Sequence, residues 1–437
     1  MQIKKRSGVL TALVAMITVT LFMTGTRAAA QKERVLYSFD GDSIYAPAHP
    51  TASLISDAAG NFYGTTLDGG ASCAGACGTA FELSPQPSGG WKQIVLHSFQ
   101  NDGQQGGYYP RAGLVSDPAG NLYGAAYLGG NTSCDIFGSG TVFELLPTVG
   151  GGWKEKVLHS FDSTGDCTDG SGPYGGLNLD AAGNLYGTTS AGGVDNYGTV
   201  FELSPSAGGS WTETVLHSFN GYDGQAPYAS LIFDPAGNLY GTTTLGGNLF
   251  YGTVFELSPA SGGRWTEKVL HSFDTGSGGY QPQAGVILDA AGNLYGTTTY
   301  GGIGTCTNLC GTVFELSPTA SGGWTKKTLH HFTNNGKDGY APGAGLTFDH
   351  AGNLYGTTED GGNGTSSACS PGCGTVFELT PAAGGGWAEK VLHNFGQYKN
   401  DGQFPEAGVV FDTAGNLYGT TNAGGAILGG TVFQIAP

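Results

Sequence analysis

The sequence predicts an all-β protein, a seven-bladed β-propeller with four antiparallel strands per blade. Three observations predict it. One repeat occurs seven times, at spacings of about 54 to 63 residues. Each repeat contains four short runs rich in β-branched and aromatic residues, bounded by Gly, Pro and Asp, with no competing helical periodicity. The repeat is also out of phase with the chain, so that the N-terminal strand is needed to close the last blade.

Three strings mark the repeat. GNLYGTT or a close variant begins at Gly60, Gly120, Gly183, Gly237, Gly292, Gly352 and Gly415. GTVFELSP or a close variant begins at Gly78, Gly140, Gly198, Gly252, Gly311, Gly374 and Gly430. A KVLHSF-like string ends at Phe39, Phe99, Phe161, Phe219, Phe273, Phe332 and Phe395. A fourth apolar run precedes each GNLYGTT string, which gives four strands per repeat, as in a propeller blade.

The order of the strands within a blade follows from the order of these runs. We expect the apolar run that ends in Asp to be innermost, followed by NLYGTT, GTVFELSP and, outermost, WTEKVLHSF. Asp-x-x-Gly-Asn turns join the first two strands, since a carboxylate accepts backbone N–H groups there and glycine tolerates positive φ. These turns and the hairpins before each Trp should lie on one face. The longer loops between strands two and three, and those between blades, should lie on the opposite face, where binding residues tend to collect.

The two ends of the repeat array predict how the ring closes. After residue 30 the chain starts with a lone outermost strand, 34–39, and the last repeat stops after its third strand, 430–437. Pairing these two segments completes the ring and leaves neither terminus as an open strand edge. The predicted blades are 50–99, 110–161, 173–219, 227–273, 282–332, 342–395, and 405–437 together with 34–39.

Residues 1–30 have the layout of a secretory signal peptide. A basic start precedes an apolar stretch from Val9 to Met23, and small residues end at Ala30, where we expect cleavage. The stretch is short for a membrane span, which takes about 20 apolar residues. The predicted domains are therefore a signal peptide at 1–30 and a propeller at 31–437, secreted or periplasmic after cleavage.

The charge of the exported part excludes some partners. Residues 1–30 hold four of the 17 basic residues and no acidic ones, so 13 basic and 34 acidic residues remain, a formal net charge of −21. An acidic surface repels nucleic-acid phosphates. We expect no nucleic-acid partner, no membrane insertion of the mature chain, and a monomer.

Over nearly the whole chain after residue 30, the strings GNLYGTT, GTVFELSP and WTEKVLHSF resemble those of the choice-of-anchor tandem repeat GloVer-containing proteins. The resemblance implies an exported bacterial protein with a propeller-like fold. The family has no established reaction, so the resemblance implies no catalytic residues.

Eight cysteines in an exported chain predict disulfides. Three CxxxC pairs, each inside one loop between strands two and three, are Cys73/Cys77, Cys306/Cys310 and Cys369/Cys373. Cys134 and Cys167 lie in loops expected on the same face, which permits a fourth bridge. The alternative is a thiolate metal site built from the fifth and sixth blades, which the CxxxC spacing disfavours because zinc sites ordinarily use CxxC.

Histidines recur at one position of the outermost strand: His97, His159, His217, His271, His330 and His393. Because outermost strands of different blades lie far apart, these histidines cannot converge on one ion. We predict that they are hydrogen-bonded scaffold residues, and that the same holds for the glutamate that recurs in GTVFELSP.

Aromatic residues recur beside a proline just before each innermost strand. They are expected to form a ring around the mouth of the central channel: Tyr45, Tyr109, Tyr174, Tyr228, Tyr280, Tyr340 and Phe404. Aromatic faces with nearby carboxylates suit sugars. The alternative is that each ring only packs between blades.

Asp-Gly pairs in the same loops offer oxygen ligands for Ca²⁺, but no loop matches an EF-hand or repeat-in-toxin pattern, and we expect no obligatory cofactor.

Residues that break the repeat are the remaining material for a site. On or near the variable face these are His49, Arg111, Asp135, Glu359, Asp360 and Glu406. The leading hypothesis is a non-catalytic binding protein for carbohydrate or another surface polymer. A hydrolase or lyase is the alternative if two or more of the four carboxylates converge in an axial pocket. A third hypothesis is a scaffold for protein partners.

Overall fold

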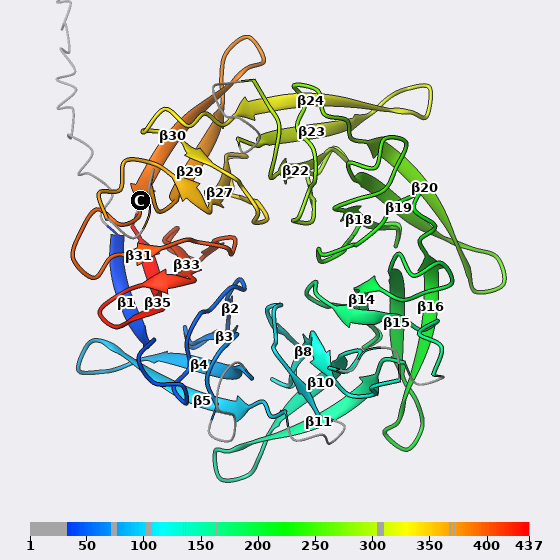
Figure 1. Ribbon diagram of the computed structural model, residues 1–437, viewed down its shortest axis with the longest axis horizontal. Coiled ribbons are helices and arrows are strands. Elements are labelled where there is room, and N and C mark those ends of the chain that lie inside the picture. The colour runs from blue at the N-terminus through cyan, green and yellow to red at the C-terminus, as the bar shows by residue number, and fades with distance from the viewer. Residues whose placement is uncertain are drawn as a thin grey trace, which may run out of the picture.

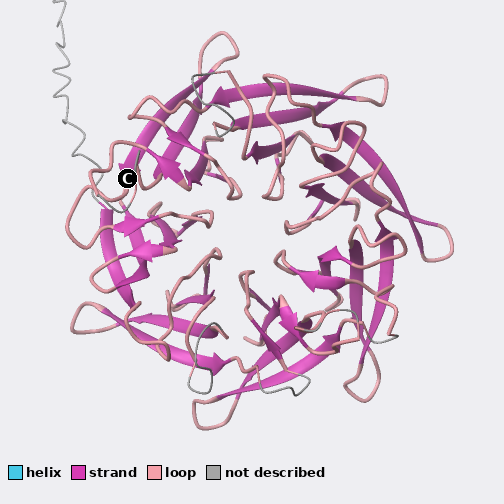
Figure 2. Ribbon diagram, in the orientation of Figure 1, coloured by secondary structure: helices cyan, strands magenta, loops and turns pink. Residues whose placement is uncertain are grey.

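The computed structural model describes residues 33–70, 77–101, 106–133, 135, 137–162, 165–303, 310–366, 369 and 372–436. Its sheets are arranged as seven blades around a central axis (Figure 1). The described residues form strands, turns and loops and contain no helix (Figure 2). They therefore contain no helix that is long and apolar enough to span a bilayer. The predicted seven-bladed propeller is confirmed, while the predicted signal peptide lies outside the described residues.

The first four blades each contain the four expected strands in antiparallel order. Blade one contains β2 (Ile55–Ser56), β3 (Phe62–Thr66), β4 (Thr79–Pro85) and β5 (Trp91–Ser98). Blade two contains β7 (Val115–Ser116), β8 (Leu122–Ala126), β10 (Thr141–Pro147) and β11 (Trp153–Ser160). Blade three contains β13 (Asn178–Leu179), β14 (Leu185–Ala191), β15 (Thr199–Pro205) and β16 (Trp211–Ser218). Blade four contains β17 (Ile232–Phe233), β18 (Leu239–Thr243), β19 (Thr253–Ala260) and β20 (Arg264–Ser272).

The last three blades repeat the pattern. Blade five contains β21 (Ile287–Leu288), β22 (Leu294–Thr298), β23 (Thr312–Pro318) and β24 (Trp324–His331). Blade six contains β26 (Thr347–Phe348), β27 (Leu354–Thr358), β29 (Thr375–Pro381) and β30 (Trp387–Asn394). Blade seven contains β32 (Val410–Phe411), β33 (Leu417–Thr421) and β35 (Leu428–Ile435), completed by β1 (Glu33–Asp40).

Short extra strands lie between the blades. β6 (Gly107–Tyr108) pairs with β9 (Leu128–Gly129), and β12 (Ser171–Pro173) pairs with β14. β25 (Gly339–Tyr340) pairs with β28 (Asp360–Gly361), and β31 (Gly402–Gln403) pairs with β34 (Ala423–Gly424). Each pair joins the segment before an innermost strand to the end of strand two or to the loop after it. The inter-blade loops and the loops between strands two and three therefore share one face.

The ring closes through its N-terminal strand, as predicted. β1 pairs antiparallel with β35, from Glu33 opposite Ile435 to Asp40 opposite Leu428. Figure 1 shows the two strands side by side, β1 in blue and β35 in red. The edge of β35 is thereby covered, and both ends of the repeat array lie in a single sheet.

The blades are held together by phenylalanines of the two outer strings. The Phe that ends each outermost strand packs on the Phe of the third strand of the next blade, with ring centroids 5.0 to 5.3 Å apart. These pairs are Phe39–Phe81, Phe99–Phe143, Phe161–Phe201, Phe219–Phe255, Phe273–Phe314, Phe332–Phe377 and Phe395–Phe433. Nearly all of these rings are completely buried. Apolar burial between neighbouring blades is therefore repeated around the whole ring.

Candidate functional site

A cavity of about 440 Å³ lies at the mouth of the central channel on the variable-loop face. In every blade the residue that follows the proline before the innermost strand lines it. These residues are Thr51, Arg111, Tyr174, Tyr228, Gln283, Gly343 and Glu406. The scaffold thus repeats seven times, but these seven positions hold six different residue types, one of them glycine. Tyr127 and Glu359, from loops after strand two, complete the lining with Pro405.

A sharp bend in the backbone orients this position. The residue before the proline has a positive φ in each blade, for example 59° at His49, 55° at Gln281 and 55° at Phe404. Residues other than glycine seldom adopt this conformation, and it costs about 1–2 kcal/mol. The bend recurs regardless of the side chain, so the surrounding fold imposes it. It sends the chain into the innermost strand with the next side chain at the channel mouth.

One side of the cavity is aromatic and holds an arginine. Arg111 donates a hydrogen bond from Nη1 to the hydroxyl of Tyr174, at 2.9 Å. Its guanidinium also lies over three tyrosine rings, 4.9 Å from the centroid of Tyr109, 5.0 Å from that of Tyr174 and 5.8 Å from that of Tyr127. The Tyr174 ring contacts that of Tyr228, with centroids 4.7 Å apart. These contacts form a wall of tyrosine rings, tilted or edge-on to one another, around the guanidinium.

The other side of the cavity is acidic. Glu359 and Glu406 both line it. Burial raises the pKa of Glu406 to about 7; the charge of Glu359 adds to the rise, while Arg111 and His49 oppose it. Burial, and then the neighbouring charge of Asp360, raise the pKa of Glu359 as well. Both carboxyls are therefore harder to ionise than a free glutamate, because each is buried beside another acidic group.

His49 does not line the cavity but lies close enough to Glu406 to affect its pKa. Its Nδ1–H donates to Asp68 Oδ2 at 2.5 Å, and this hydrogen bond is the largest cause of a raised His49 pKa. The negative charge of Glu406 also raises that pKa. Arg111 and His49 both lower the pKa of Glu406, which opposes the effect of burial without cancelling it.

Two of the seven aromatic residues predicted at the channel mouth line the cavity, Tyr174 and Tyr228. Tyr109 does not line it, but its ring contacts Arg111, which does. The other four do not line it, because they stand at different offsets from the proline. Tyr45 is 54% exposed, Tyr280 stacks on Tyr300 with centroids 5.7 Å apart, and Tyr340 and Phe404 pack in the cores between blades. Binding of a ligand by these residues stays a prediction.

Of the four carboxylates that break the repeat, two line the cavity and two do not. Asp135 is exposed and its Oδ1 accepts a hydrogen bond from the backbone N–H of Phe137. Asp360 belongs to β28, and burial raises its pKa. Neither lines the cavity, so two of the four predicted carboxylates converge there. Sequence reasoning missed Thr51, Tyr127 and Gln283; the position after each proline was a signal that could have identified Thr51 and Gln283.

A disulfide pins one loop of the variable face. Cys369 and Cys373 are bonded, with Cα atoms 5.2 Å apart. Cys77, Cys167 and Cys310 are also in disulfides. The partners predicted for them, Cys73, Cys134 and Cys306, lie outside the described residues. Disulfides of this kind are typical of proteins exported to an oxidising compartment.

Comparisons with known proteins agree with the fold. The family model of the Gloeobacter/Verrucomicrobia repeat matches residues 20–169, 136–369 and 308–437. Among solved structures, the chain is similar to the periplasmic gluconolactonase of Pseudomonas aeruginosa, with 17% identity and a TM-score of 0.50. That match covers 79% of this chain and 85% of the other. No curated protein matches in sequence.

Proposed function

This chain belongs to the Gloeobacter/Verrucomicrobia repeat family, and from its axial cavity we propose that it is an exported protein that binds carbohydrate at the channel mouth. One observation carries the proposal: a wall of tyrosines faces a pair of carboxyls across a cavity of about 440 Å³. Aromatic rings bind the C–H faces of sugars, while carboxyl and amide groups bind hydroxyls. The net acidity of the chain favours neutral or basic sugars over acidic ones.

A glycan array followed by calorimetry on each hit tests this proposal. We expect Tyr228→Ala and Gln283→Ala each to weaken binding by about tenfold, or ~1.4 kcal/mol, because each removes part of the wall or a hydroxyl partner. Tyr45→Ala is the matched control, since Tyr45 is exposed and lies outside the cavity, and its affinity should be unchanged. Absence of any sugar ligand, or equal affinity in all variants, would contradict the proposal.

Hydrolysis is the second candidate, and the carboxyl pair favours it. With a pKa of about 7, Glu406 keeps a proton that a general acid needs, and Glu359 lines the same cavity. A panel of glycosides and sugar lactones is the appropriate assay, the lactones because the gluconolactonase shares the fold. Turnover should fall as pH rises through about 7 and should be lost in Glu406→Gln while binding persists. Binding without turnover in the unaltered protein would exclude this candidate.

A further inference from the structure

The outer part of several blade interfaces holds a cluster that the function proposed above does not use. The histidine that recurs in the outermost strand faces an aspartate from the loop that follows it and a glutamate from the outermost strand of the next blade. In two such clusters, one ligand atom from each residue lies within 4.8 Å of the others: Glu33, His393 and Asp401, and His217, Asp223 and Glu267. The histidines do not meet one another, as expected, but each meets carboxylates that sequence reasoning did not place beside it.

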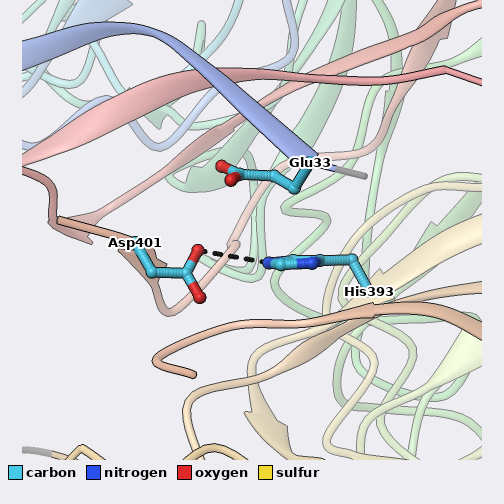
Figure 3. Close-up of side chains that lie close together, drawn as sticks. All are labelled: Glu33, His393 and Asp401. Carbon is cyan, nitrogen blue, oxygen red and sulfur yellow. Dashed lines mark hydrogen bonds and ion pairs between the residues drawn. The ribbon is translucent and has the colours of Figure 1, made fainter. Parts of the chain in front are cut away.

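The first cluster lies where the ring closes (Figure 3). His393 Nε2 is 3.1 Å from Asp401 Oδ1, and the two side chains are 5% and 1% exposed. Glu33, from β1, points toward the same place, as Figure 3 shows. Its Oε1 is buried and makes no hydrogen bond with the described residues. Two carboxylates so close are costly in a buried site unless a positive charge accompanies them.

The second cluster, between the third and fourth blades, has the same composition. His217 Nε2 lies 3.2 Å from Asp223 Oδ2. His217 Nε2 and Glu267 Oε1 are nevertheless buried atoms without a hydrogen bond to the described residues. Buried polar groups are ordinarily paired, whereas Glu267 Oε1 has no hydrogen bond with the described residues and His217 Nε2 has only its 3.2 Å ion pair with Asp223. These two atoms are the second observation, besides the grouping itself, that points to a missing partner.

A third interface, between the fourth and fifth blades, shows what replaces the carboxylates when they are absent. There Lys326 stands at the glutamate position and Gly278 at the aspartate position. A Cβ on Gly278 would lie 2.6 Å from Lys326 Nζ, so the ammonium occupies the space of the missing aspartate. Lys326 Nζ donates to the carbonyl of Gly278 and lies 5.2 Å from the ring centroid of Phe273. This interface supplies its own cation.

We propose that the clusters of Glu33, His393 and Asp401 and of His217, Asp223 and Glu267 each bind one divalent transition-metal ion of the zinc type. Imidazole nitrogen and carboxylate oxygen are both ligands of Zn²⁺, whereas Ca²⁺ takes oxygen ligands alone. Zinc–ligand bonds of about 2.0–2.2 Å in a tetrahedron place ligand atoms about 3.3–3.6 Å apart. The His–Asp separations of 3.1 and 3.2 Å lie just below that range, so a small movement would admit the ion. A water molecule would take the fourth position.

The proposed ions would hold neighbouring blades together. The first joins β1, which completes the seventh blade, to His393 and Asp401 of the sixth blade and the loop after it. Because an ion bound only by the folded ring adds its binding free energy to folding, it would strengthen the closure of the ring. The proposal concerns the outer rim and does not depend on what the axial cavity binds.

The test uses purified protein without an affinity tag, stripped with a chelator and then dialysed. We expect titration calorimetry with Zn²⁺ to show two sites, and Co²⁺ to give the visible absorption of a tetrahedral ion. His393→Gln and His217→Gln should each remove one site. His271→Gln, at the lysine interface, is the matched control and should keep both. Conversely, Gly278→Asp combined with Lys326→Glu should add a third site.

Each outcome decides the proposal. Loss of one equivalent in each single variant, with the control unchanged, supports it, and circular dichroism shows whether each variant is folded. No Zn²⁺ bound by the folded, stripped protein, or a stoichiometry that the His393 and His217 substitutions do not alter, overturns it. In that case the glutamate of each cluster, Glu33 or Glu267, is protonated, and no metal ion is needed to offset the charge of the aspartate beside it.

Discussion

Gly356 in β27 lies directly against the ring of Phe377 in β29. A Cβ built on Gly356 would be 2.7 Å from Phe377 Cζ and 2.9 Å from Leu346 Cδ2. The same crowding recurs at the glycine of each NLYGTT string, for example at Gly241 against Phe255. The residue is glycine because the phenylalanine that joins the blades takes the space of its side chain.

Gly356→Ala should therefore destabilise the protein by about 1–3 kcal/mol through overpacking. Gly345→Ala is the matched control in the same blade, because nothing lies within 4 Å of its added Cβ and its φ is not positive. The free energies of unfolding from denaturant titrations compare the two. Equal free energies of unfolding for the two variants would show that the neighbouring side chains make room for the added methyl group without loss of stability.

Single positions also explain why the site was only partly predicted. Tyr174 and Tyr228 follow the proline and line the cavity, whereas Tyr280 and Tyr340 stand two residues before it and do not. The positive φ between these offsets redirects the chain, and composition alone does not reveal that bend. Arg111, Glu359 and Glu406 were identified because they break the repeat. Tyr127 was missed because its loop places it at the channel mouth only in three dimensions.

The turn between strands one and two is a compact hydrogen-bonded element that recurs in every blade. In blade six Asp349 Oδ1 accepts the N–H groups of Ala351 and Asn353, both within 2.9 Å. Its Oδ2 accepts the side-chain amide of Asn353 at 2.8 Å and the hydroxyl of Tyr355 at 3.2 Å. Burial opposes ionisation, but these hydrogen bonds together hold the Asp349 pKa below its usual value.

Asp349→Ala should cost about 1–3 kcal/mol, because it leaves several donors without their acceptor. Since the folded pKa is lowered, the contribution of Asp349 is present above the unfolded pKa near 3.8 and is lost as pH falls through the lower folded value. Thermal unfolding at neutral and acid pH measures both effects. Asp195→Ala, at an exposed loop position, should change neither.

Acidic groups at the interfaces between blades make stability depend on pH in the opposite direction from Asp349. Burial raises the pKa of Glu389 to about 7; the charge of Asp338 adds to the rise and that of His330 opposes it. The folded pKa thus lies above the unfolded value of 4.5, so the protonated form stabilises the fold. That stabilisation is complete below about pH 4.5 and is lost as pH rises through about 7.

With a chelator present, the midpoint of thermal unfolding should accordingly be lower near pH 8 than near pH 5. Glu389→Gln should reduce this difference, because glutamine keeps the shape of the side chain and does not ionise. An unchanged difference in the variant would assign the dependence to other groups.

At the scale of the whole molecule, the closing strand is the critical segment. Deletion of residues 33–40 would expose the edge of β35 and remove Phe39 from its contact with Phe81. We expect the shortened protein to aggregate or to lose cooperative unfolding. Size-exclusion chromatography and calorimetry measure these properties. A monomer with an unchanged thermal midpoint would show that closure contributes little.

The seven blades and their closure were predictable, because they follow from a repeated pattern and from where that repeat begins and ends in the chain, whereas the short extra strands between the blades were not predicted. The clusters at the blade interfaces were not predictable either, because they depend on which residues of neighbouring outermost strands stand opposite each other. His393, Asp401 and Glu33 lie in three separate segments, and no spacing in the sequence links Glu33 to the other two.

The pairing of β1 with β35 also sets the order of events during synthesis. β1 is the first described strand to be translated and β35 the last, so the ring stays open until nearly the entire propeller has been made. The six blades that are complete within themselves can form earlier, each from neighbouring segments. A chain crossing a membrane in the N-to-C direction would reach its final shape only after transfer is almost finished. This seam is also where we expect the ring to open first under mechanical force.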